Sequence, residues 1–180
     1  MSIRFRYGRE RSDGTWTGAR GAVLRYQSHS EHVAPADKMQ NLARQNPVAF
    51  ERILNRQKVH AGTTKAFAIV EAAKNFLSAG VTLPEHLNPA SDAHRKLYTG
   101  VSGLGIVTWE YLTMLLSHDG VKADTWITEF VGRAIGRRIS SEAAGGLVKE
   151  AAQKLGVNEK TLDHAIWGYA SATGLKDMAA

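Results

Sequence analysis

From residue 36 onward, the apolar residues of this chain recur at steps of three and four, the spacing that places side chains on one face of an α-helix. Residues 63–79 give the clearest case, and Gly80, a residue type that commonly follows the last turn of a helix, comes directly after them. Half-buried strands alternate apolar and polar residues, and almost no such alternation occurs after residue 35. The sequence therefore predicts an all-α fold whose helical pattern begins near residue 36.

Prolines and capping residues divide this pattern into separate helices. Asn46-Pro47 separates two of them, because proline lacks the N–H donor that a helix interior needs. Two further prolines place residues 81–90 in a loop. Residue types that favour the helix N-cap occur at four expected starts: Ser91, Asp124, Ser140 and Asn158. The predicted helices cover residues 36–45, 48–55 and 63–79, segments that begin after Ser91, at Ile106 and after Asp124, and residues 141–155 and 159–172.

Residues 1–34 differ from the rest of the chain. They hold six arginines and three acidic residues, and so supply +3 of the formal net charge of +6. Residues 3–7 alternate in type and could form a short strand. Two interpretations stay open: a basic arm that follows a phosphate backbone, or a terminus that packs Phe5, Tyr7 and Trp16 onto the helical body. The predicted organisation is a basic N-terminal extension over residues 1–34 and a helical domain over residues 35–180.

Composition narrows the class of protein. A pI near 9.7 favours an anionic partner, but it does not by itself identify nucleic acid. The chain has no cysteine, which excludes disulfides and thiol catalysis. No apolar run approaches 18 residues and no signal-peptide pattern occurs, so we expect a cytoplasmic monomer without a membrane partner. No metal site is predicted, because the best spacing among the histidines is His29-x-x-His32.

Two glycines mark a tight turn in the middle of the chain. Gly103 and Gly105 flank Leu104, an arrangement that suits a turn with unusual backbone dihedrals. A helical pattern follows directly, carried by Ile106, Trp109, Leu112 and Leu116. The turn would therefore present backbone N–H groups at the positive end of a helix, where anions bind. Phosphate is the expected ligand.

Asp124 stands at the start of the next predicted helix. Aspartate is a favoured N-cap, and this role alone accounts for a carboxylate at the position, with about 1 kcal/mol of stabilisation. A capping carboxylate is also held rigidly, so the same residue is suited to chemistry at the mouth of a cleft. The two roles do not exclude each other.

The turn and the Asp124 segment together resemble the helix-hairpin-helix (HhH-GPD) superfamily of DNA glycosylases. The family's hairpin usually reads apolar-Pro-Gly-apolar-Gly, and residues 101–105 read Val-Ser-Gly-Leu-Gly. Its catalytic segment usually reads Val-Asp-Thr-His-apolar, and residues 123–127 read Ala-Asp-Thr-Trp-Ile. Residues 64–73 resemble the helix before the hairpin, and residues 161–167 resemble the closing helix. The resemblance extends over residues 36–173.

Three departures from the family pattern narrow the expected chemistry. Val107 stands where bifunctional members carry the lysine that forms a Schiff base with the sugar, so β-lyase chemistry through this position is excluded. Ser102 replaces a frequent proline, and Trp126 replaces a frequent histidine. The absence of cysteine excludes the four-cysteine iron–sulfur cluster of many relatives, and no other cofactor is expected.

The resemblance implies a monofunctional DNA N-glycosylase of base excision repair. Such an enzyme flips a damaged or modified base out of double-stranded DNA and hydrolyses its glycosidic bond. Asp124 is the expected catalytic residue, and Trp126 and Trp109 are pocket candidates, although Trp109 also lies on the apolar helix face. The expected DNA contacts are Ser102, Gly103, Gly105, Ile106, Val107, Thr108 and Lys122. The alternative is a non-catalytic module that binds distorted or modified DNA.

Overall fold

The predicted all-α class is confirmed. The computed structural model describes residues 9–29, 38–54, 56–59 and 62–175, and within these ranges it contains nine α-helices, one short 3₁₀ helix and no strand. In the same ranges, strand-like backbone pairing is confined to two isolated β-bridges, Glu10 with Trp16 and Lys58 with Thr64. No helix in this part of the chain is long and apolar enough to cross a membrane.

By their contacts the helices form two compact units, residues 1–105 and residues 106–180. The described part of the first unit contains α1 (Gly18–His29), α2 (Met39–Ala43), α3 (Pro47–Ile53), α4 (Lys65–Ser78), η3 (Pro84–His86) and α5 (Asp92–Thr99). The second contains α6 (Ile106–Leu115), α7 (Thr125–Ala134), α8 (Ser141–Leu155) and α9 (Glu159–Thr173). The eight helices predicted from residue 36 onward are thus present, with ends shifted by a few residues.

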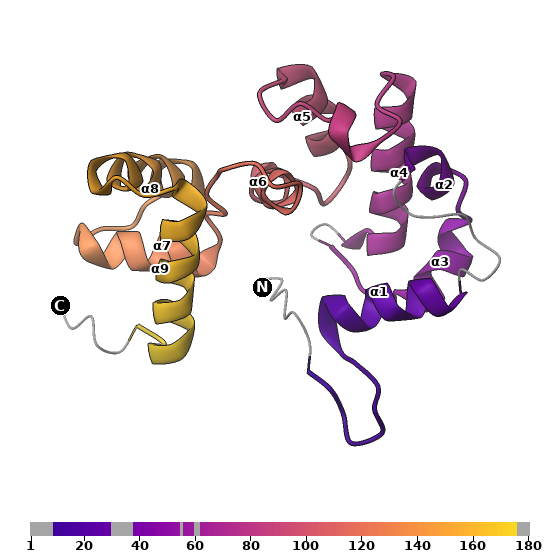
Figure 1. The fold of residues 1–180 in the computed structure, drawn as a ribbon, viewed down its shortest axis with the longest axis horizontal. Coiled ribbons are helices and arrows are strands. Elements are labelled where there is room, and N and C mark those ends of the chain that lie inside the picture. The colour runs from indigo at the N-terminus through magenta and orange to yellow at the C-terminus, as the bar shows by residue number, and fades with distance from the viewer. Residues whose placement is uncertain (1–8, 30–37, 55, 60–61, 176–180) are drawn as a thin grey trace. The chain divides into compact units, whose positions relative to one another are not determined.

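In the first unit α4 is the central helix, and α2, α3 and α5 pack against it (Figure 1). One face of α4 joins Phe50 of α3 in a buried cluster through Ala66 and Val70. Another face packs Ala68 and Ala72 around Val101. Ala66 and Val70 lie on the apolar face that the spacing within residues 63–79 predicts, whereas Ala68 and Ala72 form a second buried face outside that pattern.

The prediction that helices begin near residue 36 is wrong, because α1 precedes that point. Arg25 of α1 donates a hydrogen bond from Nε to the carbonyl oxygen of Ile53 at 2.7 Å. The rings of Tyr26 and Phe50 meet edge to face with centroids 5.6 Å apart. Trp16 stacks under the Arg20 guanidinium at 3.8 Å. The possible strand over residues 3–7, with Phe5 and Tyr7, lies outside the described residues.

In the second unit α7, α8 and α9 pack against one another (Figure 1). Ile127 and Val131 of α7 lie buried against Val148 of α8 and Ile166 of α9. Val121 and Ala123, in the segment before α7, belong to the same cluster. This core therefore holds the segment that leads into Asp124.

Three predicted caps are present, and one is not. Ser91, Asp124 and Ser140 each accept hydrogen bonds from amides in the first turns of α5, α7 and α8. Asn158 occupies the N-cap position of α9 but makes no capping hydrogen bond with its side chain. The Asp119 carboxylate caps α9 instead, accepting from the amides of Glu159 at 3.2 Å and Lys160 at 2.8 Å.

Candidate functional site

The predicted turn before α6 is present. Gly103 has φ +87°, a conformation that side-chain-bearing residues rarely adopt, and the Leu104 amide donates to the Val101 carbonyl at 3.0 Å. The Ser102 hydroxyl hydrogen-bonds to the Thr63 hydroxyl at 3.2 Å, which ties the turn to the segment before α4. Gly105 has space around its Cα, so an added methyl group would meet nothing within 4 Å.

The turn lies at the division between the two units. Ser102, Gly103 and Gly105 end the first unit, and Ile106, Val107 and Thr108 form the first turn of α6 in the second. Ser102, Gly105 and Ile106 are exposed, while the other three are partly exposed. The six residues of the predicted hairpin contact are thus at least partly exposed.

Asp124 is the N-cap of α7, as the sequence predicted. Its Oδ1 accepts hydrogen bonds from the backbone amides of Trp126 at 2.9 Å and Ile127 at 3.4 Å. Its Oδ2 lies 3.3 Å from Nζ of Lys122. The side chain is 22% exposed. One carboxylate oxygen is thus fixed by the helix, and the other is held by an ion pair within reach of solvent.

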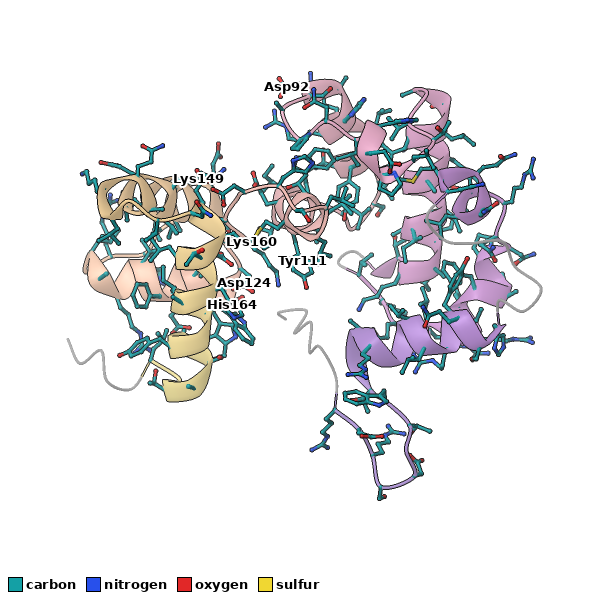
Figure 2. All side chains as sticks on the ribbon, viewed as in Figure 1. Asp92, Tyr111, Asp124, Lys149, Lys160 and His164 are labelled. Atoms are coloured by element: carbon teal, nitrogen blue, oxygen red, sulfur yellow. The ribbon has the colours of Figure 1, made fainter. Side chains whose placement is uncertain are left out.

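Lys122 connects Asp124 to α6. Its Nζ lies 4.3 Å from the centroid of the Tyr111 ring, a distance at which a cation interacts favourably with an aromatic face. The lysine side chain is only 19% exposed, so the ammonium group is largely enclosed by Tyr111 and Asp124. Figure 2 labels Tyr111 and Asp124 within the second unit.

A second carboxylate, which the sequence analysis missed, lies behind this pair. Asp163 of α9 is 8% exposed, and its Oδ1 accepts from the Lys122 amide at 3.0 Å. Burial, together with the nearby charge of Asp124, raises the pKa of Asp163 to about 6 against the opposing effects of the Lys122 amide and ammonium. Lys122 therefore contacts two carboxylates, the buried one of Asp163 through its backbone amide and the partly exposed one of Asp124 through its ammonium group.

A signal for Asp163 was present in the sequence. It stands three and seven residues before Ile166 and Ala170, which are buried residues of the same helix. A carboxylate on the apolar face of an amphipathic helix is rarely buried without a partner. Its partner, the Lys122 amide, is 41 positions away in sequence, so the pairing could not be read from local spacing.

The two pocket candidates lie in different environments. Trp109 is 2% exposed within α6, which favours the core role over stacking on a base. Trp126 is partly exposed in the first turn of α7, where its amide binds Asp124. Trp126 therefore stays the better candidate beside the carboxylate. On α9, the exposed side chains of His164 and Trp167 stack with centroids 5.8 Å apart, next to Asp163 in sequence.

In the part of the chain that the structure describes, no three histidine or carboxylate side chains come together in a way that could hold a metal ion. The charged groups of the site are Asp124, Lys122 and Asp163. A carboxylate held at a helix N-terminus can stabilise a developing positive charge or orient a water molecule.

The chain belongs to a family that is described as a domain of unknown function (DUF8548), which matches residues 12–171. This match spans both units, the turn and the Asp124 segment. No curated protein and no solved structure matches the chain. The resemblance to helix-hairpin-helix glycosylases thus stays a prediction that rests on the turn, on Asp124 and on the order of the helices around them.

Proposed function

We propose that this protein binds double-stranded DNA and acts as a monofunctional DNA N-glycosylase, with Asp124 as its catalytic residue. The observation that carries the proposal is the fixed, partly exposed carboxylate of Asp124 at the start of α7. The order of glycine turn, helix and Asp-Thr segment supports it, because that order resembles the glycosylase pattern. The net charge of +6 supports an anionic partner.

In the proposed reaction a water molecule attacks C1′ of a flipped-out nucleotide. The bond between C1′ and the base nitrogen breaks, its electron pair leaves with the base, and the water oxygen bonds to C1′. The base then takes up a proton, and the water gives up one. Asp124 would stabilise the positive charge that develops on the sugar and orient the water. Two helix amides already fix its Oδ1, so little reorganisation is needed.

Lys122 has to change partner during this reaction. Its ammonium lies 3.3 Å from Oδ2 of Asp124, and a cation at that place opposes positive charge at C1′. A DNA phosphate is an alternative anion for the same side chain. DNA binding would therefore draw Lys122 toward the backbone and release Oδ2 for the sugar or the water.

Asp163 acts in this proposal as a positioning residue. Its carboxylate holds the Lys122 amide at 3.0 Å and so fixes the backbone two residues before Asp124. Glycine amides of the hairpin, at Gly103 and Gly105, would hold a backbone phosphate without sequence preference, because phosphate contacts position a protein rather than specify a sequence. Val107 provides no amine for a Schiff base, so the expected product is an unbroken abasic strand.

The test is base release from a panel of duplexes that carry modified bases, with strand breaks scored before and after alkali. Asp124→Asn is the informative variant, because asparagine also caps helices well but carries no charge. Ser140→Ala is the matched control, since it removes the cap of α8 without touching the site. We expect alkali-dependent breaks with the wild type and with Ser140→Ala, and none with Asp124→Asn.

A second function has support of its own. Capping alone is a sufficient structural reason for a carboxylate at Asp124. A non-catalytic module for distorted or modified DNA would bind lesion duplexes tightly, release no base from any of them, and bind equally well with Asp124→Asn. The same panel, measured for binding as well as for release, separates the two functions.

A further inference from the structure

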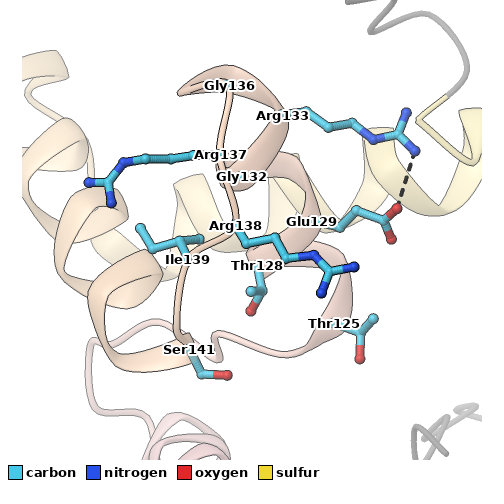
Figure 3. A pocket seen from close by; sticks show the side chains of 10 residues that line it. All are labelled: Thr125, Thr128, Glu129, Gly132, Arg133, Gly136, Arg137, Arg138, Ile139 and Ser141. Atoms are coloured by element: carbon cyan, nitrogen blue, oxygen red, sulfur yellow. Dashed lines mark hydrogen bonds and ion pairs between the residues drawn. The ribbon is translucent and has the colours of Figure 1, made fainter.

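A surface hollow of about 830 Å³ lies along α7 and the turn between α7 and α8 (Figure 3). Arginines and hydroxyl-bearing residues dominate its lining, and Thr125, one of them, directly follows Asp124. The lining of the hollow therefore begins one residue after Asp124, in the second unit.

The charge of the hollow is positive and only partly compensated. Arg133 pairs with Glu129 at 3.1 Å and also donates a hydrogen bond to the carbonyl oxygen of Leu175, so its guanidinium already has two partners. Arg137 and Arg138 are exposed, and their guanidinium groups have no ion-pair partner among the described residues. Two positive charges are thus presented to solvent beside one neutralised pair.

Hydroxyl groups line the hollow together with the arginines. Figure 3 shows the side chains of Arg137 and Arg138 extending in opposite directions. The Thr128 hydroxyl already donates to the Asp124 carbonyl at 2.8 Å. The Arg138 guanidinium and the exposed Thr125 hydroxyl are therefore donors of the lining that are open to a ligand that only accepts hydrogen bonds.

We propose that this hollow is a phosphate-binding site centred on Arg138. A planar guanidinium with five N–H donors matches the oxygens of a phosphate group, and the Thr125 hydroxyl of the same lining is a further donor. The source that the site fits best is the DNA backbone beside the flipped nucleotide, and this part of the inference rests on the proposed function. A free phosphate compound is the other source of the same chemistry.

The dimensions suit a backbone. A ten-residue helix such as α7 is about 15 Å long, several times the 3.4 Å of duplex axis that each phosphate of a strand occupies, so more than one phosphate would lie along α7. Arg138 would bind one of them after the strand has passed Asp124.

The experiment measures the affinity of the full-length protein for a labelled duplex across a series of salt concentrations. Arg138→Ala is compared with Lys154→Ala, which also removes one positive charge from the second unit. Lys154 is exposed and lies 13 positions along α8 from Ser141 of the hollow, about 20 Å away. That distance exceeds the Debye length of about 10 Å at 0.1 M salt. Pyrophosphate is titrated separately against the same three proteins.

We expect Arg138→Ala to weaken duplex binding about tenfold and to lower the slope of log K against log salt by about one, because one phosphate contact is lost. Lys154→Ala should leave both values near those of the wild type.

Equal effects of the two variants would overturn the inference, and the proposed glycosylase function would be untouched. If the wild type binds no DNA, the proposed function fails. In that case, pyrophosphate binding by the wild type that is lost in Arg138→Ala would show that the hollow binds a free phosphate compound. If the wild type does not bind pyrophosphate either, the phosphate site is overturned as well.

Discussion

Replacing Asp163 with asparagine should remove a pH-dependent cost from the folded protein. The carboxyl group is 8% exposed, and burial together with the charge of Asp124 raises its pKa from 3.8 to about 6. Between these two pH values the folded state keeps a proton that the unfolded state has released. The stability of the folded state is therefore higher at low pH and falls as the pH rises from about 4 to above 6.

The pKa shift sets the size of the effect. A shift of about two pH units corresponds to about 3 kcal/mol, and the full cost is present only once the group is ionised in both states. Asparagine has nearly the same shape and retains an acceptor oxygen for the Lys122 amide. Asp163→Asn should thus match the wild type near pH 4 and exceed its free energy of unfolding by up to about 3 kcal/mol above pH 7.

The assay is urea unfolding of both proteins at several pH values between 4 and 8. Subtracting one curve from the other cancels the carboxylates that the two proteins share, including Asp119, whose pKa is lowered by amides of α9. Parallel curves across this range would refute the reasoning, because they would mean that Asp163 is not ionised at a cost in the fold.

Two further predictions concern the folding of each unit. Asp124→Ala should lower the free energy of unfolding by about 1 kcal/mol more than Asp124→Asn does, because both variants lose the ion pair with Lys122 but only asparagine keeps an acceptor for the two amides of α7. Chemical denaturation of the pair checks this, and equal losses would contradict the capping role. Gly21→Ala should lower the melting temperature and weaken α1, because a Cβ at Gly21 would lie 1.9 Å from the carbonyl oxygen of Trp16. The matched control is Gly146→Ala, where a Cβ meets nothing within 4 Å. An unchanged melting temperature for both variants would contradict the reasoning.

The helices from residue 36 onward could be predicted because each carries local information. Asn46 illustrates this, since its side chain accepts from the amides of Val48 and Ala49 and Pro47 follows it as the first residue of α3. The sequence of α1 carries no comparable local signal of a helix. Its two glycines lower helix propensity, and Arg25 and Tyr26 stabilise it by contacts with α3 that lie about 25 positions away.

In the candidate site too, the features that depend on neighbouring residues could be predicted, and those that depend on distant residues could not. Asp124 and the Gly103 turn were predicted because a cap and a left-handed glycine depend on their immediate neighbours. Asp163 was missed because its hydrogen bond spans 41 positions, and Asp119 was missed as the cap of α9 for the same reason. Long-range pairs of this kind depend on tertiary packing, which one sequence does not display.

The most direct test of the central claim is base release from a panel of modified duplexes by the wild type and by Asp124→Asn. The account predicts that at least one modified base leaves its strand, that breaks appear only after alkali, and that Asp124→Asn releases nothing while it stays folded. Equal release by both proteins would contradict the role of Asp124. Release of no base by the wild type, with tight binding of lesion duplexes by both proteins, would contradict the enzyme and favour the binding module.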